Sequence, residues 1–550
     1  MAAQFDPETT QTPAAAGPGD PPATPGRDAA TPRSAPRRQA SGHSRRAIQK
    51  VLVANRGEIA VRIMRGLAEL GMSSVAVFSE ADRAALHVRL ANEAVPIGPG
   101  PSGQSYLRIE AIIDAARRAG ADAVHPGYGF LAENPRLARA VEEAGLVFIG
   151  PGADAIERMG NKLEAHGIAR QVGVPLIPSS GGAVENLDQA RRCAKTIGYP
   201  LMLKAAAGGG GKGMRIIDSD EELEHALPLV RGEARSAFGD DQVYMERYLR
   251  KPHHVEIQIL CDAEGRGIYL GERDCSVQRR HQKVVEETPA PLVDDATRRA
   301  MGEAAVALAR AVDYRNAGTV EFLVDQEGHF YFLEMNTRLQ VEHPVTEMVT
   351  GIDIVKEQLR IAQGQPLRFA QESIHCRGAA MEFRIYAEDP AHQFVPSLGA
   401  VRRLRLPSGP GIRNDAGIYP GYEIPIHYDP LIAKLVVWGE DREEARRRAA
   451  RALGEYLVAG VRTNLPFHRW LVHHPRFATG EVDTGFIEEV WDGRFASQGA
   501  AAEEEIAMIA AAVQALEDRR RVARQAAPSD DGPSADGSRW RYQRRPGGAT

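Results

Sequence analysis

Two glutamates and an asparagine stand on neighbouring segments, residues 319–324 and 329–336, that read as the strands of a hairpin. A two-residue Glu-Gly turn between them places Glu321 directly opposite Glu334. Asn336 follows two residues later and points to the same face. Facing carboxylates repel each other unless a cation lies between them, and carboxylate and amide oxygens suit Mg²⁺. The spacing therefore predicts a metal site; two exposed glutamates on an edge hairpin are the alternative.

Immediately after this hairpin, Arg338, Gln340 and Glu342 alternate along the chain. In an extended segment they project to one side as a cation, an amide and an anion. Arginine is well suited to hold a small planar anion through two parallel hydrogen bonds, and Glu342 beside it could accept a proton from that anion. The three residues predict a site for a small carboxylate-like molecule.

Four consecutive glycines at 208–211 lie between Lys204 and Lys212. A strand follows them where a dinucleotide-binding turn needs a helix, and Gly213 stands where a P-loop needs Ser or Thr. What remains is a strand, a glycine flap and a second strand, whose amides can approach phosphate oxygens closely. The alternative is a flexible hairpin without a ligand.

Two further segments add polar groups to this pattern. An apolar strand ends in Glu-Arg-Tyr-Leu at 246–249 and could offer its backbone to an adenine edge. Gln278, His281 and Lys283 lie near one another in a dense polar stretch. Together with the glycine flap and the carboxylate pair, they indicate phosphoryl transfer onto a small carboxylate-like acceptor.

The elements that must position these groups begin at Lys50, where residues 50–79 read as strand, turn, helix and strand. Strands that alternate with helices at this spacing indicate βαβ units around a parallel sheet. The chain has 550 residues, enough for two to four domains, and a net charge of −5, which gives no basic field for nucleic acid. The sequence has no apolar run near the roughly 20 residues of a membrane span. Its four cysteines form no CxxC pair, which fits a reducing cytoplasm.

The two ends differ from the middle. Residues 1–46 are rich in Pro, Ala, Gly, Ser and Arg and predict a disordered tail; they lack the apolar core of a secretion signal and carry too many acids for a transit peptide. Residues 503–524 predict a helix with acids first and bases last, and 525–550 are again loose. This helix could dock a partner or cap its own domain; its role and that of the tails stay open.

Seven motifs in this order resemble the biotin carboxylase family. They are VANRGEIAVRI, HPGYGFLAEN, KAAAGGGGKGM, ERDCSVQRRHQKVVEE, EMNTRLQVEHPVTE, FRIYAEDP and YDPLIAKL, and they extend from about Lys50 to about Glu489. The resemblance implies a multidomain α/β and α+β protein. Its expected parts are a disordered tail at 1–46, a Rossmann-like N-terminal domain at 47–163, an ATP-grasp domain at 164–370 with a mobile glycine lid at about 177–248, a β-rich C-terminal domain at 371–490, and a helix plus disordered tail at 491–550.

The resemblance also implies roles for residues that match the family's motifs. The implied ATP contacts are Lys162, Lys204, Gly209, Gly210, Gly211, Glu246, Arg247, Tyr248, Leu249, His254, Gln278, His281, Glu321 and Glu334. Glu321, Glu334 and Asn336 match the metal positions, in agreement with the hairpin argument. Lys283, Arg338 and the backbone of Val341 match the bicarbonate site, with Glu342 as the base and Arg384 on the ureido oxygen of biotin.

The activity so implied is the carboxylation of biotin N1 with ATP, Mg²⁺ (or Mn²⁺) and bicarbonate, through carboxyphosphate. The sequence contains no Ala-Met-Lys-Met biotinylation motif, so biotin is expected on a separate carrier protein that also serves a carboxyltransferase. The final acceptor stays open between acetyl-CoA, propionyl-CoA, another acyl-CoA and pyruvate. Arg62, Arg65 and Glu69 match dimer-interface positions of some members and predict a homodimer.

The sequence departs from the family in two places. Ala206 and Ala207 stand at the lid where many members carry Ser or Gly, and Leu398 stands where Pro is usual. Neither change removes an implied catalytic group. Two other functions remain as alternatives: another ATP-grasp ligase that joins a carboxylate to an amine, and a non-enzymatic ATP-binding relative.

Overall fold

The computed structural model describes residues 47–205, 214–238, 241–493 and 512–520. Its first sheet has five parallel strands in the order β3-β2-β1-β4-β5. Helices cover such sheets on both faces, which is why the interior strands are continuous apolar runs. The elements are β1 (Lys50–Val53), α1 (Gly57–Glu69), β2 (Ser73–Ser79), α2 (Leu86–Leu90), β3 (Glu93–Gly98), α3 (Ile109–Arg118), β4 (Ala123–His125), α4 (Pro135–Glu143), β5 (Val147–Phe148) and α5 (Ala153–Gly160). The expected Rossmann-like domain is confirmed.

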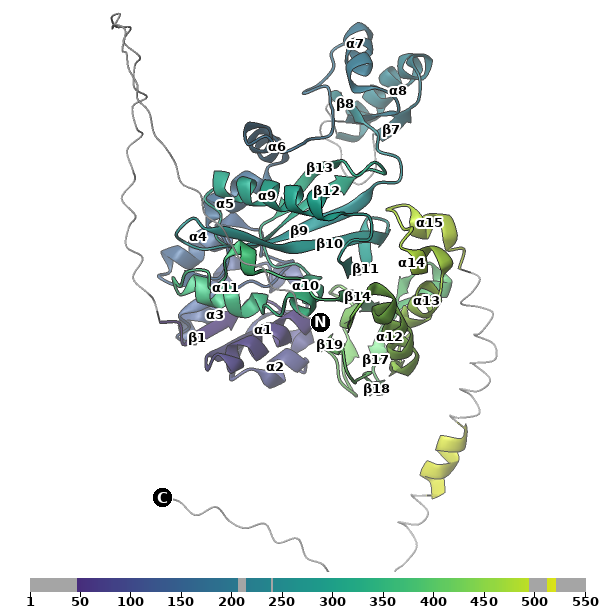
Figure 1. The fold of residues 1–550 in the computed structure, drawn as a ribbon. Helices are drawn as coiled ribbons and strands as arrows, with labels where there is room; N and C mark the ends of the chain where they lie inside the picture. Colours follow the sequence, from purple (N-terminus) through teal and green to yellow (C-terminus); the bar gives the residue numbers. More distant parts are fainter. Residues whose placement is uncertain (1–46, 206–213, 239–240, 494–511, 521–550) are drawn as a thin grey trace, which may run out of the picture. The chain divides into compact units, whose positions relative to one another are not determined.

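The second sheet has eight antiparallel strands in the order β13-β12-β9-β10-β11-β14-β21-β19. It crosses the expected boundary at residue 370, because the C-terminal strands β14, β21 and β19 continue the sheet of the central domain (Figure 1). The strands are β9 (His253–Cys261), β10 (Gly267–Arg279), β11 (Gln282–Thr288), β12 (Asn316–Val324), β13 (Phe330–Asn336), β14 (Ala379–Tyr386), β19 (Ile412–Ala416) and β21 (Leu431–Gly439).

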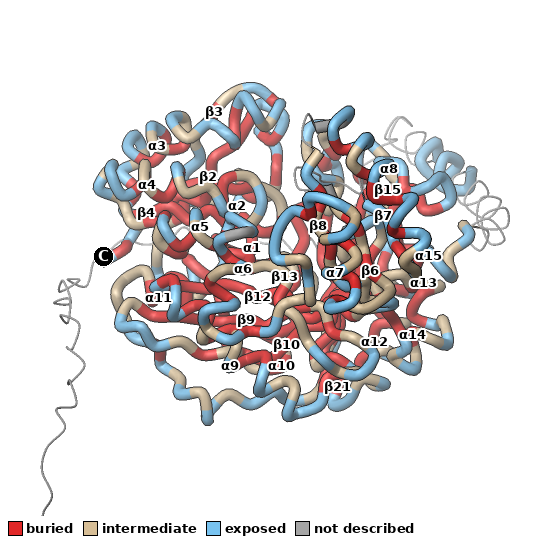
Figure 2. The backbone as a smooth tube through the Cα atoms, turned by 90° about the horizontal axis from the view of Figure 1, so that it is seen from above, coloured by how far each residue is buried: buried red, intermediate tan, exposed pale blue. Residues whose placement is uncertain are grey.

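Helices pack on this large sheet. They are α6 (Lys162–Gln171), α9 (Asp295–Ala311), α10 (His343–Thr350), α11 (Ile354–Ala362), α12 (Arg442–Glu455), α13 (Leu465–Leu471), α14 (Pro475–Thr479) and α15 (Phe486–Val490). Figure 2 shows that buried residues are concentrated along strands such as β9, β10 and β12. Glu256, Arg273 and Glu321 on these strands are buried, charged and paired with one another in register, on the face where the site lies.

The C-terminal part also has short strand pairs, so it mixes strands with four helices. These strands are β15 (Glu388–Asp389), β16 (Val395–Pro396), β17 (Gly399–Ala400), β18 (Arg403–Arg405), β20 (Glu423–Ile424) and β22 (Leu457–Ala459). Within the predicted helix 503–524, residues 512–520 are helical and exposed, and the remainder lies outside the described residues. In the described part of the chain, no helix combines the length and the apolar character that crossing a membrane requires.

A third sheet forms the expected lid. Strands β7-β6-β8 pair antiparallel and have an apolar core of their own with two helices. The elements are α7 (Leu187–Ile197), β6 (Leu201–Ala205), β7 (Met214–Ile217), α8 (Asp220–Phe238) and β8 (Val243–Arg247). The two strands predicted on either side of the glycine flap are therefore confirmed, while Gly209, Gly210 and Gly211 lie outside the described residues, as do residues 1–46.

Candidate active site

A cavity of about 1290 Å³ gathers most of the predicted site residues. Its walls come from β9, β12, β13, the β10–β11 hairpin, the segment after β13 and residues 483–489. The predicted residues that line it are Lys162, Tyr248, His254, Gln278, His281, Lys283, Glu321, Glu334, Asn336, Arg338, Val341, Glu342 and Arg384. The predicted lid contacts Lys204, Glu246, Arg247 and Leu249 do not line it; Lys204 and Glu246 instead form an ion pair with each other on β6 and β8.

The facing of Glu321 and Glu334 is confirmed, although the turn differs from the prediction. The chain closes the hairpin with three residues, because the backbone N–H of Asp325 donates to the carbonyl of His329 at 2.9 Å. Gly328 takes a φ of +85°, which favours glycine at such a turn. This turn alone would shift the register by one residue. A bulge on β13 at Leu333 restores the register before Glu334 is reached.

A third glutamate, which is buried, extends the carboxylate pair across the sheet. Glu256 on β9 is the register partner of Glu321 on its one side and of Arg273 on β10 on its other side. One row of the sheet therefore runs Glu334, Glu321, Glu256, Arg273, with all four side chains on one face. Arg273 is 0% exposed and is hydrogen-bonded to Glu256, so this end of the row has its own counter-charge.

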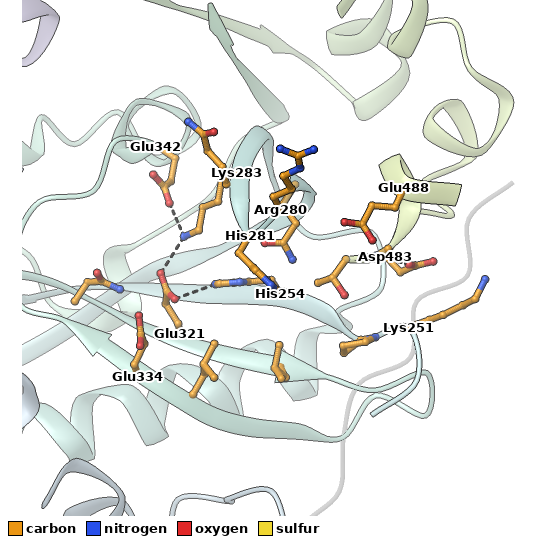
Figure 3. Close-up of a pocket in the computed structure, with 18 of the residues that line it drawn as sticks. Lys251, His254, Arg280, His281, Lys283, Glu321, Glu334, Glu342, Asp483 and Glu488 are labelled. Atoms are coloured by element: carbon orange, nitrogen blue, oxygen red, sulfur yellow. Dashed lines mark hydrogen bonds and ion pairs between the residues drawn. The ribbon is translucent and has the colours of Figure 1, made fainter. Parts of the chain in front are cut away.

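Lys283 joins this row to Glu342 (Figure 3). Its ammonium group lies 2.9 Å from Glu321, 2.7 Å from Glu342 and 2.6 Å from Glu256. Burial lowers the pKa of Lys283, but the surrounding anions outweigh it and hold the pKa well above its usual value. Lys283 is therefore a fixed positive charge between the carboxylate pair and the predicted base.

Glu342 is the N-cap residue of α10, where the helix dipole favours an anion. Its carboxylate is 0% exposed and accepts hydrogen bonds from Lys283 and, at 2.8 Å, from Arg384. Burial acts to raise the pKa of Glu342, but Lys283, Arg384 and Arg273 together lower it well below its usual range. In this structure Glu342 is thus an ionised carboxylate surrounded by cations.

The other two members of the predicted metal site have different surroundings. Glu321 Oε2 lies 3.1 Å from His254, and Lys283 with this histidine lowers the pKa of Glu321 against the effect of burial. The side chain of Glu334 is 42% exposed and has Lys162 at 3.9 Å. Burial and the nearby Glu321 raise the pKa of Glu334. Because a cation would offset this repulsion, the oxygen set of Glu321, Glu334 and Asn336 fits Mg²⁺.

Arg338 is held from three directions. Its guanidinium donates to Asn336 at 2.7 Å, to Gln340 at 2.6 Å and to Glu133 at 2.8 Å. The segment that carries it is irregular rather than a strand, yet Arg338, Gln340 and Glu342 all line the cavity as predicted. The carbonyl of Val341 accepts a hydrogen bond from the buried Lys434 at 2.7 Å, which fixes the orientation of this peptide.

Arg384 lies where the main cavity meets a second one of about 310 Å³. Arg338 and Val341 also line both cavities. The second cavity has aromatic walls that include Tyr128 and Tyr428, so it suits a small apolar ring with a polar edge. Arg384 is the group that such a ring would meet at the junction.

The hairpin of β10 and β11 places Gln278 and Lys283 opposite each other, as their closeness in sequence predicted. Its two-residue turn consists of Arg280 and His281, with φ values of +49° and +66°. Residues other than glycine rarely adopt this conformation, and it concentrates at functional sites. The turn presents His281 to the cavity.

The three residues predicted at a dimer interface lie on α1. Arg62 is buried and donates to Glu347 at 2.9 Å and to Asp353 at 2.7 Å within its own chain. Glu69 pairs with Lys356, whereas Arg65 is exposed. The structure thus gives Arg62 and Glu69 intramolecular partners.

Sequence reasoning missed Glu133, Glu256 and Lys434. Glu256 had a signal, because it alternates with His254 as a charge inside an apolar strand. Glu133 follows β4 at the carboxyl edge of the parallel sheet, a position where ligand-binding residues are common. Lys434 had no such signal, because a single lysine in a strand does not indicate that the strand, here β21, is buried.

Comparisons with known proteins agree with this geometry. Family models describe three consecutive parts: a biotin carboxylase N-terminal domain at 47–156, a carbamoyl-phosphate synthase L chain ATP-binding domain at 161–370, and a biotin carboxylase C-terminal domain at 382–489. Biotin carboxylase 1 of Bacillus subtilis is 51% identical over 442 residues, which cover 80% of this chain and 98% of that protein. A pyruvate carboxylase subunit of Methanothermobacter thermautotrophicus is 52% identical over 440 residues, with 80% and 89% covered.

A solved structure is similar as well. The biotin carboxylase domain dimer of Hydrogenobacter thermophilus 2-oxoglutarate carboxylase, in complex with MgADP, ADP and bicarbonate, matches with a TM-score of 0.73 and 47% identity. The match covers 81% of this chain and 98% of that one. On these matches the chain belongs to the biotin carboxylase family of ATP-dependent ligases and is a biotin carboxylase subunit.

Proposed function

We propose that this chain carboxylates N1 of biotin held on a separate carrier protein, with MgATP and bicarbonate as the other substrates. The observation that carries the proposal is that one cavity joins the carboxylate pair of Glu321 and Glu334 to Arg338, Glu342 and Arg384. Phosphate, small anion and biotin groups would therefore meet without leaving the site. The matched dimer structure with MgADP and bicarbonate supports this choice of ligands.

We assign each group of site residues to one ligand. Glu321, Glu334 and Asn336 would hold Mg²⁺, which supplies charge neutralisation for the phosphate oxygens. ATP would contact four residues of the cavity and eight of the lid. The cavity residues are Lys162, His254, Gln278 and His281, and the lid residues are Lys204, Gly209, Gly210, Gly211, Glu246, Arg247, Tyr248 and Leu249. Arg338, Lys283 and the backbone of Val341 would hold bicarbonate. Arg384 would meet the ureido oxygen of biotin in the second cavity.

Glu342 would then remove the proton of bicarbonate at Arg338, and the anion would attack the γ-phosphorus of ATP, break its bond to the bridging oxygen, and give carboxyphosphate with ADP as the leaving group. This intermediate releases CO₂ and phosphate, phosphate takes the proton of biotin N1, and N1 attacks CO₂ while Arg384 stabilises the ureido oxygen. Two of the three cations that lower the pKa of Glu342, Lys283 and Arg384, are groups that substrates would engage. Glu342 therefore becomes a stronger base as Lys283 and Arg384 turn to their ligands.

The protein around the site also belongs to the proposal. Its domains would be residues 47–163, 164–370 and 371–490. The protein would act in the cytoplasm as a homodimer, as in the matched dimer structure. The carboxyl group would pass to a carboxyltransferase that acts on an acyl-CoA. A pyruvate-specific transferase is the second candidate, because the matched pyruvate carboxylase subunit is 52% identical.

The test is ATP hydrolysis by the purified chain with Mg²⁺ and bicarbonate, with and without free biotin. Turnover should need bicarbonate and rise with biotin, and Arg338→Ala should abolish it. Arg139→Ala is the matched control, since Arg139 pairs with Asp154 and Glu157 on the surface. Turnover that ignores bicarbonate, or that needs an amine, would assign the chain to another ATP-grasp reaction.

A further inference from the structure

A second layer of buried charge lies beside Arg384 in the large sheet. Glu286 on β11 and Glu382 on β14 are direct partners across the antiparallel strands, and both are 0% exposed. Arg384 lies two residues along β14 and shares the face of Glu382. Lys434 on β21 is the register partner of Arg384. Four ionisable side chains therefore occupy one small patch of the sheet, on the face that α10 covers.

Three carboxylate oxygens of this patch have no hydrogen-bond partner among the described residues. Glu286 uses one oxygen to accept from Arg384 Nε at 2.6 Å, and its other oxygen has no partner among the described residues. Neither oxygen of Glu382 has such a partner. The ammonium group of Lys434 is committed to the carbonyl of Val341 and to Glu58, at 2.7 and 3.2 Å. Two ionised carboxylates left in this state would be costly, because burial removes the water that would solvate them.

Burial, more than the mixed charges around it, opposes the ionisation of Glu382. Lys434 and Arg384 favour the ionised form, while Glu286 and Glu342 disfavour it. Helix α10, which packs on β14 and β21, also carries His343 and Glu347. Burial is the largest effect and raises the pKa of Glu382 well above its usual value. Burial likewise raises the pKa of Glu286 to about 7. Two opposed carboxyl groups in a dry site are the usual setting for a shared proton.

We propose that Glu382 carries a proton at neutral pH and donates it to the open oxygen of Glu286, so that the acid pair positions Arg384. One hydrogen bond then gives a partner to two of the three carboxylate oxygens that lacked one, the protonated oxygen of Glu382 and the free oxygen of Glu286. Glu286, fixed in this way, stays an ionised acceptor for Arg384. A neutral Glu382 also leaves Arg384 with one fewer anion beside it, so more of its positive charge is available to the ureido oxygen. The inference rests on the proposed contact of Arg384 with biotin.

The first experiment separates this positioning role from a general loss of structure. Glu382→Leu removes the donor and should lower kcat/KM for free biotin about 10-fold, the magnitude of a lost buried hydrogen bond. Bicarbonate-dependent ATP hydrolysis without biotin should be retained in this variant. Glu382→Gln keeps the shape and an N–H donor, and should restore kcat/KM to within about 3-fold of the unmodified protein. A Glu382→Gln variant as impaired as Glu382→Leu would overturn the proposal.

The second experiment detects the proton directly. The unmodified protein at pH 7 should show the infrared carbonyl stretch of a protonated carboxylic acid, shifted in D₂O and missing in Glu382→Gln. An unchanged spectrum in Glu382→Gln would overturn the proton assignment, and this test does not require Glu382→Leu to fold. A missing band with unaltered biotin kinetics in Glu382→Leu would overturn the positioning role. Arg384→Ala with unaltered biotin kinetics would instead refute the proposed biotin contact, while the band still reports on Glu382.

Discussion

Glu133 and Arg338 are 205 residues apart in sequence and are hydrogen-bonded beside the main cavity, which Arg338 lines. The carboxylate of Glu133 accepts from Arg338 Nε at 2.8 Å, and its second oxygen accepts from the backbone N–H of Thr337 at 3.0 Å. Because Nε is occupied, the terminal nitrogens of Arg338 are directed to Asn336 and Gln340, inside the cavity. The N-terminal domain thus sets the orientation of a side chain that the central domain supplies.

Weakening the contact between Glu133 and Arg338 should raise the KM for bicarbonate more than the KM for ATP. Glu133→Gln keeps the size of the side chain but loses a charge-assisted hydrogen bond, so the KM for bicarbonate should rise about 3- to 10-fold. The estimate is modest because the Glu133 side chain is 41% exposed. Steady-state ATP hydrolysis at varied bicarbonate measures the change. Glu157→Gln, on a surface ion pair with Arg139, is the control, and equal KM values in both variants would contradict the orienting role.

The cations around Glu342 predict a pH effect with a defined sign. Burial raises the pKa of Glu342 and Lys283 is the foremost group that lowers it, so Lys283→Met should raise that pKa. A base is lost when it is protonated, so the acid limb of residual bicarbonate-dependent turnover should move to higher pH. The pH profile of kcat/KM for bicarbonate measures the shift. Lys251→Met is the control, because Lys251 lines the same cavity but pairs with Glu489 at its edge.

A profile that stays in place in Lys283→Met would show that a group other than Glu342 sets the acid limb. A profile that shifts equally in Lys251→Met would assign the effect to the overall field of the cavity. Either result would remove the pH argument for Glu342 as the base, while leaving its position between Lys283 and Arg384 unchanged.

Local patterns predicted the first strand–helix–strand unit and the facing of Glu321 and Glu334 because neighbours in sequence fix both. The hairpin also shows the limit of such reasoning. The expected two-residue turn is wrong, and the facing pair survives because the bulge at Leu333 restores the register. No feature of the sequence pattern marked this bulge.

The contacts that complete the site could not be predicted in this way. Strands β11 and β14 pair Glu286 with Glu382, although almost a hundred residues separate them, and no short-range signal specifies such a pairing. The same holds for Glu133 with Arg338. The family resemblance implied which residues would react, whereas the long-range packing places counter-charges beside them.

The two glutamates of the carboxylate pair should contribute differently to the free energy of unfolding. Glu321 is buried and paired with Lys283 and His254, so Glu321→Gln should destabilise the metal-free protein by about 1–3 kcal/mol. Glu334 is half-exposed and its contact to Lys162 is long, so Glu334→Gln should change the free energy of unfolding by no more than about 0.5 kcal/mol. Urea unfolding in EDTA measures both values. Both variants should weaken Mg²⁺-dependent ADP binding by calorimetry; retention in either would remove that glutamate from the metal site.

The second cavity predicts a separation of biotin from bicarbonate kinetics. Tyr428 forms part of its wall, is stacked under Arg56 at 4.1 Å and is hydrogen-bonded to Ser79 at 2.5 Å. Tyr428→Leu should raise the KM for free biotin about 10-fold, because it removes an aromatic wall, and should leave biotin-independent ATP hydrolysis in place. Tyr419→Leu is a close control: Tyr419 also lies under an arginine at 4.1 Å but does not line the cavity. Equal effects of the two substitutions on biotin would mean that domain packing, rather than the wall of this cavity, determines the KM.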